Sequence, residues 1–184
     1  MEGWGILVSA IACGYMMVAS SCYKGDDYVV LIRKGDHSDD RFPYLWVNKK
    51  KMEFDITFTE SCRYDVGSDQ SDQNKLFGIG YSPGHRMNSV RFGWFYNPTL
   101  DVIEISAYTY EDGERYILQM AEVAIGETNR YILTIDGDRH DLEVVGKARE
   151  RVLTKSSTFS YMLHPFFGGN QPAPHHIYIK MTRP

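Results

Sequence analysis

The chain has 184 residues, of which 43% are hydrophobic and 24% are charged, and its formal net charge is −4 at pH 7. This length predicts a single domain that is large enough to bury a core of its own. Nucleic-acid-binding domains are normally basic, so the acidic balance argues against a nucleic-acid partner.

Residues 5–21 form a run of apolar and small residues that ends at Cys22, and the chain turns polar directly after it. The run is shorter than the roughly 20 apolar residues of a membrane-spanning helix and is typical of a signal-peptide core. The sequence Ala19-Ser20-Ser21 before a cysteine resembles the lipobox of bacterial lipoproteins, which implies that Cys22 is the lipid-modified residue. We therefore predict a signal peptide of lipoprotein type over residues 1–22. The alternatives are a plain secretory signal and a buried N-terminal helix.

This signal places the protein in the bacterial cell envelope, held at the membrane only by a lipid at Cys22, with one domain over residues 23–184. Cys13 lies inside the signal core, and Cys62 is the other cysteine. If Cys22 is acylated, Cys62 has no cysteine partner and acts as a small buried hydrophobe. If Cys22 is not acylated, a Cys22–Cys62 disulfide becomes possible in an oxidising compartment.

Most of the remaining chain predicts short β-strands, because apolar and polar residues alternate between turn signals. The predicted strands are residues 28–33, 52–59, 76–81, 88–96, 100–110, 116–124, 130–135, 141–145, 157–164 and 176–181. The turn signals include Asn97-Pro98, and Glu111-Asp112-Gly113 and Asp136-Gly137-Asp138 stand in hairpin positions. Residues 144–155 are the one stretch compatible with a helical turn. Many short strands at this spacing predict an antiparallel β-sandwich or barrel.

Three segments narrow this prediction: residues 76–81, residues 85–94, and residues 166–175, where a Gly-Gly turn leads into the rigid Pro172-Ala173-Pro174 loop. Together they resemble a group of bacterial jelly-roll proteins of the concanavalin A-like lectin/glucanase fold, many of them uncharacterised predicted lipoproteins. The resemblance implies an all-β antiparallel sandwich, the concanavalin A-like jelly roll. This fold carries lectins, hydrolases, lyases and structural modules, so it does not decide the activity.

Glu53 and Asp55 are the weak catalytic candidates, because alternate carboxylates on one strand point to the same face. They resemble the Glu-x-Asp-x-x-Glu strand of laminarinase-type glucanases. A retaining glycosidase needs a second carboxyl group about 5 to 5.5 Å from the first. Here Phe58 occupies the position of the second glutamate, and Glu60 falls two residues late. A solvated strand face is the alternative, so we expect no catalysis, with a divergent polysaccharide hydrolase or lyase as the second hypothesis.

The strand over residues 88–96 follows a loop that carries His85 and Arg86. Alternation places Trp94 on the core face and Arg91 on the opposite face, where Glu104 or Tyr108 of a neighbouring strand meets it. Placed polar groups on an apolar floor suit a polysaccharide or other glycan, and the planar fork of Arg91 suits hydroxyl pairs or a uronate carboxylate. The predicted ligand-binding residues are His85, Arg86, Arg91, Glu104, Tyr108, Asn170 and His175. The alternative is that they only connect loops through hydrogen bonds.

The remaining polar groups predict neither a metal nor a cofactor. His175 and His176 are adjacent, and neighbouring strand residues point to opposite faces, so they do not readily share one Zn²⁺. The cluster Asp69, Asp72 and Asn74 lacks the spacing of a defined calcium loop.

Overall fold

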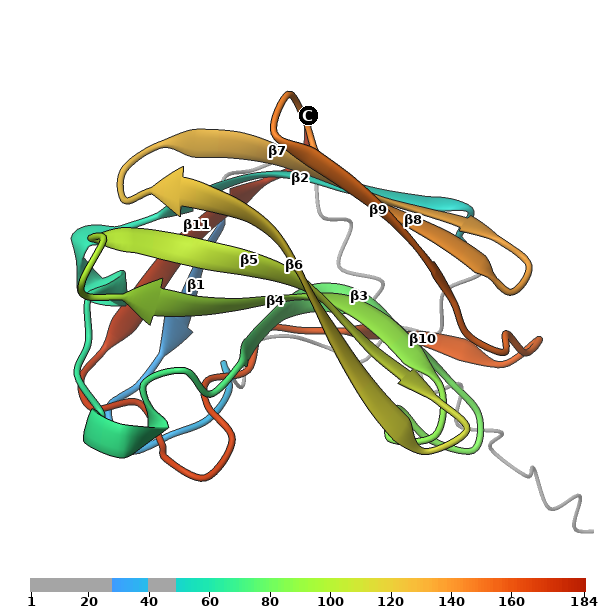
Figure 1. Cartoon of the computed structure of the whole chain (residues 1–184), viewed down its shortest axis with the longest axis horizontal. Helices are drawn as coiled ribbons and strands as arrows, with labels where there is room; N and C mark the ends of the chain where they lie inside the picture. Colours follow the sequence, from blue (N-terminus) through green and yellow to red (C-terminus); the bar gives the residue numbers. More distant parts are fainter. Residues whose placement is uncertain (1–27, 40–48) are drawn as a thin grey trace, which may run out of the picture.

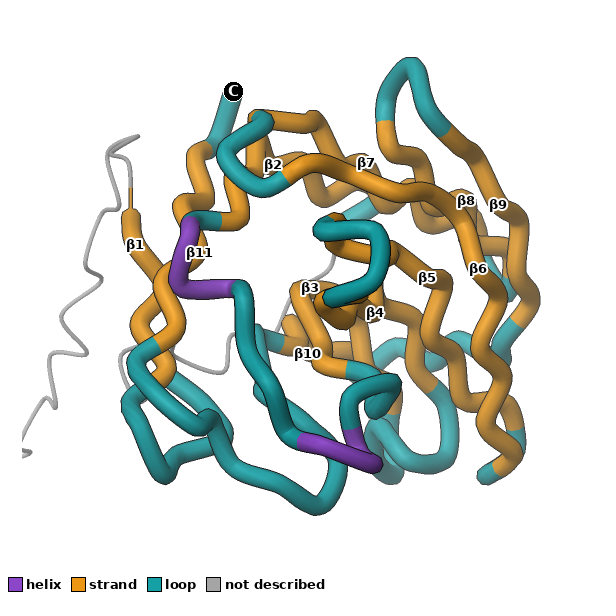
Figure 2. The backbone as a smooth tube through the Cα atoms, turned by 60° about the vertical axis from the view of Figure 1, so that its left-hand side comes forward, coloured by secondary structure: helices purple, strands orange, loops and turns teal. Residues whose placement is uncertain are grey.

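The computed structural model describes residues 28–39 and 49–184, which form two antiparallel sheets packed face to face (Figure 1). The six-stranded sheet has the order β1-β11-β2-β7-β8-β9, and the five-stranded sheet has the order β10-β3-β4-β5-β6. The strands are β1 Tyr28–Ile32, β2 Lys51–Phe58, β3 Asn74–Tyr81, β4 Ser89–Asn97, β5 Val102–Glu111, β6 Glu114–Ala124, β7 Thr128–Asp136, β8 Arg139–Val144, β9 Ala148–Leu153, β10 Ser160–Leu163 and β11 Ile177–Thr182. Two 3-10 helices, η1 Glu60–Cys62 and η2 Gly67–Asp69, lie between β2 and β3 and are purple in Figure 2. The fold is the predicted jelly roll; the predicted signal peptide and Cys22 lie outside the described residues.

The strand predictions are confirmed to within a few residues, and the helical turn over residues 144–155 is wrong. β8 ends at Val144, Gly146 turns the chain with a φ of 75°, and β9 follows. β9 is an edge strand with half-buried and exposed residues in alternation. Its exposed Arg149 and Arg151 both pair with Asp141 of β8. Cross-strand pairing of this kind is not visible in a local charge pattern.

The core lies between the inner faces of the two sheets, where the predicted alternation holds. In β2 the side chains of Phe54, Ile56 and Phe58 are buried, and the Phe58 ring lies 5.1 Å from the ring of Trp94 in β4. Trp94 is fully buried, which confirms that it packs in the core. Ile177, Ile179 and Met181 are fully buried in β11, between β1 and β2.

Two glycines of β3 shape the outer face of the five-stranded sheet, which is the side that points away from the six-stranded sheet. Gly78 pairs with Arg91 of β4, and Gly80 pairs with Tyr161 of β10. A Cβ at Gly78 would lie 2.3 Å from the Arg91 Cβ, and one at Gly80 would lie 2.9 Å from the Tyr161 ring. The missing side chain at Gly78 therefore lets the β4 backbone at Arg91 approach β3 closely, and the one at Gly80 lets the Tyr161 ring lie across β3.

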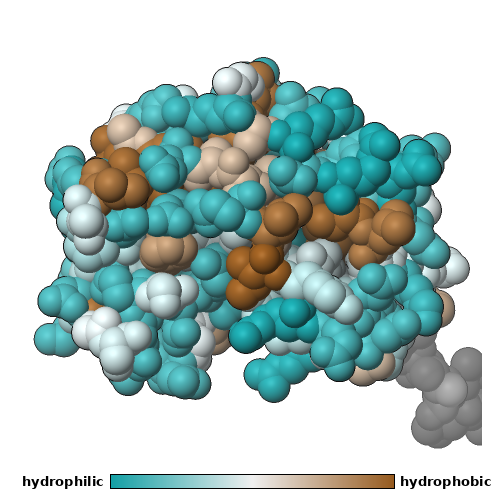
Figure 3. All heavy atoms as spheres, in the orientation of Figure 1, coloured by the Kyte–Doolittle hydropathy of each residue, from teal (hydrophilic) through white to brown (hydrophobic). Residues whose placement is uncertain are grey.

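Large apolar side chains are exposed at the edge formed by β6. Tyr116, Ile117 and Leu118 are each about half exposed there, and β6 approaches β9 of the other sheet. The face drawn in Figure 3 is mostly hydrophilic, with hydrophobic side chains gathered in a band. No helix within residues 28–39 and 49–184 is long and apolar enough to cross a membrane.

Candidate functional site

The outer face of the five-stranded sheet carries a group of cationic and aromatic side chains, which we name the Lys75 cluster: Lys75, Arg91, Tyr108 and Phe166. Neighbouring strands supply three of its members, because Lys75 lies on β3 and Arg91 of β4 pairs with Tyr108 of β5, while Phe166 lies in the loop after β10. The Lys75 Nζ lies 5.3 Å from the centroids of both the Tyr108 and the Phe166 ring. The Arg91 guanidinium lies 5.5 Å from the Tyr108 centroid. These are cation–π distances, so each ring faces a positive charge.

Backbone pairing fixes the loop after β10 against Lys75. The Lys75 amide donates to the Phe166 carbonyl at 2.8 Å, and the Phe166 amide donates back to the Lys75 carbonyl at 2.9 Å. The Lys75 ammonium also donates to the Gly168 carbonyl at 2.8 Å. On its other side, Phe166 stacks with His37 at 5.0 Å between ring centroids and 13° between planes. Phe166 is thus held by β3 and by the segment after β1.

The region is electropositive. Burial first, and the Arg91 charge second, lower the pKa of Lys75 to about 8, while Asp72 acts in the opposite direction. Burial followed by the Arg91 charge also lowers the pKa of His85. Burial also lowers the pKa of His164, although its contact with the Pro165 carbonyl opposes this shift. Each shift disfavours one more positive charge beside those already present.

The structure brings several predicted ligand-binding residues together around the Lys75 cluster. Arg91 and Tyr108 belong to it, and Tyr108 is the predicted cross-strand neighbour that lies opposite Arg91. His85 and the exposed Arg86 lie in the loop between β3 and β4, and the charge of Arg86 contributes to the lowered pKa of Lys75. This part of the predicted site is therefore spatially coherent.

Glu104 lies elsewhere on the same face, so of the two predicted neighbours of Arg91 it is Tyr108 that lies opposite this residue. Glu104 is opposite Phe95, four residues further along β4 than Arg91, and accepts a hydrogen bond from the Asn97 amide. Its other cross-strand neighbour is Glu122 of β6. The sequence analysis missed Glu122, because strand pairing is needed to place it beside Glu104.

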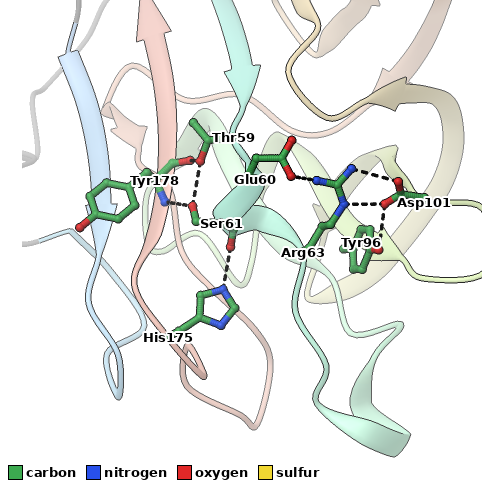
Figure 4. A network of polar contacts seen from close by, with 8 residues as sticks. All are labelled: Thr59, Glu60, Ser61, Arg63, Tyr96, Asp101, His175 and Tyr178. Atoms are coloured by element: carbon green, nitrogen blue, oxygen red, sulfur yellow. Dashed lines mark hydrogen bonds and ion pairs between the residues drawn. The ribbon is translucent and has the colours of Figure 1, made fainter.

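His175 belongs to a different network, at the end of the sandwich where η1 meets β11 (Figure 4). Its Nε2 lies 2.8 Å from the Ser61 carbonyl oxygen, and the Ser61 hydroxyl accepts the Tyr178 amide at 2.7 Å. The structure thus favours the alternative that His175 connects loops. Asn170 is exposed on the loop between β10 and β11.

The second half of this network ties η1 to the turn between β4 and β5. Arg63 donates from Nε and Nη2 to the two oxygens of Asp101, at 2.7 and 2.9 Å, and also pairs with Glu60. The Tyr96 hydroxyl donates to the same Asp101 at 2.9 Å. Asp101 has a φ of 54°, a backbone conformation that residues other than glycine rarely adopt, and these three hydrogen bonds hold the residue in it.

Glu53 and Asp55, the weak catalytic candidates, lie on the outer face of the six-stranded sheet, the opposite side of the molecule from the Lys75 cluster. Arg130 of β7 donates to both Asp55 oxygens at 2.8 and 2.9 Å and lies 3.6 Å from Glu53. Lys51 also pairs with Glu53. The hydrogen bonds from Arg130 lower the pKa of Asp55, which is the reverse of what a general acid requires.

Asp69, Asp72 and Asn74 line a small, open hollow beside Gly168. Their polar atoms are largely engaged: Asp69 accepts from Gln171 at 3.1 Å, and Asn74 contacts both the Gly168 amide and the Tyr64 hydroxyl. Within the described part of the chain, no three His, Cys, Asp or Glu side chains are grouped so that they can hold a metal ion.

The sequence analysis missed Lys75 for a specific reason. Simple alternation puts Lys75 on the same face as Phe77 and Ile79, which are core residues. A register shift between Lys75 and Gly78 changes the alternation, so that Lys75 shares the outer face with Gly78. The signal that remains in the sequence is the pair Gly78 and Gly80 a few residues after Lys75, which is the second residue of β3.

The chain is similar in structure to carbohydrate-active proteins. No family model matches it, and no curated protein matches its sequence. A polysaccharide lyase of family 18 superposes with a TM-score of 0.55 at 8% identity, over 88% of this chain and 87% of the lyase. A family GH16 mixed-linkage glucan protein of Bacteroides ovatus, solved with an oligosaccharide product, superposes with a TM-score of 0.51 at 10% identity, over 85% and 79% of the two chains. At this identity the likeness establishes the fold alone.

Proposed function

We propose that the protein binds a polysaccharide on the outer face of its five-stranded sheet and does not cleave it. The observation that carries the proposal is the Lys75 cluster, in which two aromatic rings and two cations from three strands and one loop converge. Aromatic rings match the apolar C–H faces of sugars, and a few fixed donors orient the hydroxyl groups. The structural neighbours, which include a lyase and a glucan-active protein, are compatible with a glycan ligand.

The carboxyl groups support binding over cleavage. A glycosidase acid has a raised pKa so that it holds a proton at neutral pH. Among the described carboxyl groups whose pKa departs from its usual range, every pKa is lowered: Asp55, Asp101, Glu127, Asp138 and Asp141. Hydrogen bonds and ion pairs keep these groups ionised.

One observation favours a second candidate, a polysaccharide hydrolase. Glu104 and Glu122 are direct cross-strand neighbours on the outer face of the five-stranded sheet. Such neighbours have Cβ atoms about 4.5 to 5.5 Å apart, which is compatible with the carboxyl separation of a retaining glycosidase. Substitution of Glu104 or Glu122, rather than of Glu53 or Asp55, is therefore the test for hydrolase activity.

Affinity electrophoresis through gels that contain single polysaccharides tests the proposal, with reducing-sugar release and absorbance of unsaturated products measured on the same protein. We expect retardation without product, and we expect Phe166→Ala to remove the retardation. Tyr178→Ala is the control, because Tyr178 is an exposed aromatic residue on the outer face of the other sheet. Product that disappears in Glu104→Gln would replace the binding proposal with the hydrolase. Unchanged retardation in Phe166→Ala would show that the Lys75 cluster is not the binding site.

The same proposal includes export and lipid attachment at Cys22, supported by the apolar run and small residues before this cysteine. A polysaccharide-binding protein in the envelope lies where such polymers are encountered. Cys22→Ser is expected to move the protein from the membrane to the soluble fraction of a bacterial host. Membrane partition that does not change in Cys22→Ser contradicts the anchor but leaves the glycan site standing.

A further inference from the structure

We infer that the ligand is an anionic glycan, whose carboxylate or sulfate group binds the Lys75 ammonium between the rings of Tyr108 and Phe166. The inference rests on the proposed function and names the substrate class of the same site. A carboxylate and a sulfate ester share the required chemistry, which is a compact anion with several acceptor oxygens on a sugar.

The distribution of charge is the first argument. The chain as a whole is acidic, with a net charge of −4, yet Arg91, Arg86 and Arg115 all lie close enough to Lys75 to lower its pKa. Asp72 is the acidic group that acts on Lys75 in the opposite direction. Like charges brought together on one face repel one another, and an anionic ligand relieves this repulsion.

The hydrogen-bonding capacity of Lys75 is the second argument. An ammonium group has three N–H donors, and its bond within the described residues goes to the neutral Gly168 carbonyl. Within the described part of the chain Lys75 forms no ion pair, whereas Lys51, Lys147 and Lys155 each lie beside a carboxylate. A half-buried lysine that contacts a carbonyl and two rings retains donors for an anion.

The surroundings strengthen such a contact. Tyr108 is 4% exposed, and Phe166 is half-buried against His37. Side chains that exclude water lower the local dielectric constant, and the attraction between opposite charges rises as it falls. The rings also provide the apolar surface against which the sugar attached to the anionic group packs.

A purely structural role for Lys75 is the competing explanation, because its bond to Gly168 secures the loop after β10. The two roles respond differently to substitution. Lys75→Met keeps the apolar stem and removes the charge, while Lys75→Arg keeps the charge over the whole neutral and alkaline range. A structural lysine changes the unfolding midpoint, whereas an anion-binding lysine also changes the affinity for a charged polymer.

The pH dependence separates Lys75 from its neighbours. Lys75 has a pKa of about 8, so it loses its proton as the pH rises from 7 to 9, and anion affinity is expected to fall over this window. The charged groups that act on Lys75 are Arg91 of β4, Arg115 of β6, Arg86 of the β3–β4 loop and Asp72, and arginine and aspartate are residue types whose ordinary pKa values lie outside this window. His85 and His164 have lowered pKa values and are neutral throughout, and Tyr108 has a raised pKa and keeps its proton.

The test is affinity electrophoresis of the whole chain with polygalacturonate, a sulfated galactan and the neutral glucan laminarin, at about pH 7 and about pH 9. We expect binding to polygalacturonate, to the sulfated galactan or to both, and which of them binds identifies the anion. Loss of one charge-assisted contact predicts about tenfold weaker binding in Lys75→Met. Lys75→Arg is expected to bind the anionic polymer at both pH values. Arg115→Gln removes a second positive charge near Lys75, at an exposed position.

Lys180→Met is the matched control, since Lys180 is an exposed lysine on the outer face of the other sheet. Laminarin binding at the same site, insensitive to Lys75→Met, would overturn the anionic ligand and leave the proposed function intact. Binding to none of the three polymers would overturn both. Anion binding that Lys75→Met and Arg115→Gln leave unchanged would also refute the inference.

Discussion

Gly78→Ala tests whether the outer face of the five-stranded sheet depends on the glycines of β3. The added Cβ would lie 2.1 Å from the Val90 carbonyl oxygen and 2.3 Å from the Arg91 Cβ. Both positions belong to or adjoin the backbone of β4, so no flexible side-chain end can move aside. The paired strands must separate, or the register must change, in the middle of the sheet.

Overpacking of this kind costs typically about 1 to 3 kcal/mol in the free energy of unfolding. A backbone clash closer than 3 Å places Gly78→Ala toward the upper part of that range. For a urea slope of about 1 to 3 kcal/mol per molar, the midpoint of urea unfolding is expected to fall by about 1 M. The displaced Arg91 should also weaken binding of the anionic polymer, so two independent measurements report on one substitution.

Gly84→Ala is the control, because no atom lies within 4 Å of a Cβ built at Gly84. Where the native backbone tolerates alanine, a glycine-to-alanine change is neutral or stabilises the protein by about 0.4 to 1 kcal/mol, because it lowers the conformational entropy of the unfolded chain. The reasoning is refuted if Gly78→Ala and Gly84→Ala unfold at the same urea concentration. A Gly78→Ala protein that unfolds early but binds normally would show that Gly78 supports the sheet without positioning Arg91.

Two further predictions concern the six-stranded sheet. Deleting residues 177–184 removes the fully buried Ile177, Ile179 and Met181, and burial of each side chain stabilises the fold by about 1.5 to 3 kcal/mol. The truncated protein should therefore show no cooperative thermal unfolding. An unchanged melting midpoint would contradict the assignment of β11 to the core. Asp141, held by Arg151 and Arg149, has its pKa lowered from 3.8 to about 2, so its contribution to stability is present above its usual pKa and is lost as the pH falls toward 2. Between about pH 5 and about pH 2, the midpoint of urea unfolding should therefore fall more steeply in the wild type than in Asp141→Asn. Parallel curves would show that the ion pairs of Asp141 contribute nothing to stability.

The fold was largely predictable from local patterns. Alternation identified the strands and the core faces, and Asp112-Gly113 marked a hairpin turn whose two residues have φ values of 50° and 86°. The edge strand β9 was not identified, because its alternating charges gain meaning only from Asp141 on the neighbouring strand. Local sequence specifies which way a side chain points along a strand, and the neighbouring strand specifies what it meets.

The candidate site was predictable only in part, for the same physical reason. Arg91 and Tyr108 share the outer face by simple alternation, whereas His175 comes from a loop, and loop residues have no periodicity from which a direction can be read. Lys75 escaped detection because a register shift in β3 reverses its face.

That register shift also explains why the proposed site lies where it does. Without it, Lys75 would point into the core with Phe77 and Ile79, where an unpaired charge is unfavourable. With it, Lys75 shares the outer face with Gly78 and Gly80, where the β4 backbone at Arg91 approaches Gly78 closely and the Tyr161 ring of β10 covers Gly80. The three substitutions of β3 proposed above, Lys75→Met, Lys75→Arg and Gly78→Ala, therefore examine one arrangement from two sides. Lys75→Met removes the charge and keeps the apolar stem, Lys75→Arg keeps the charge, and Gly78→Ala changes the packing and leaves the charge. If anion binding responds to both kinds of change while Lys180→Met and Gly84→Ala behave as wild type, charge and packing on this face act together in binding.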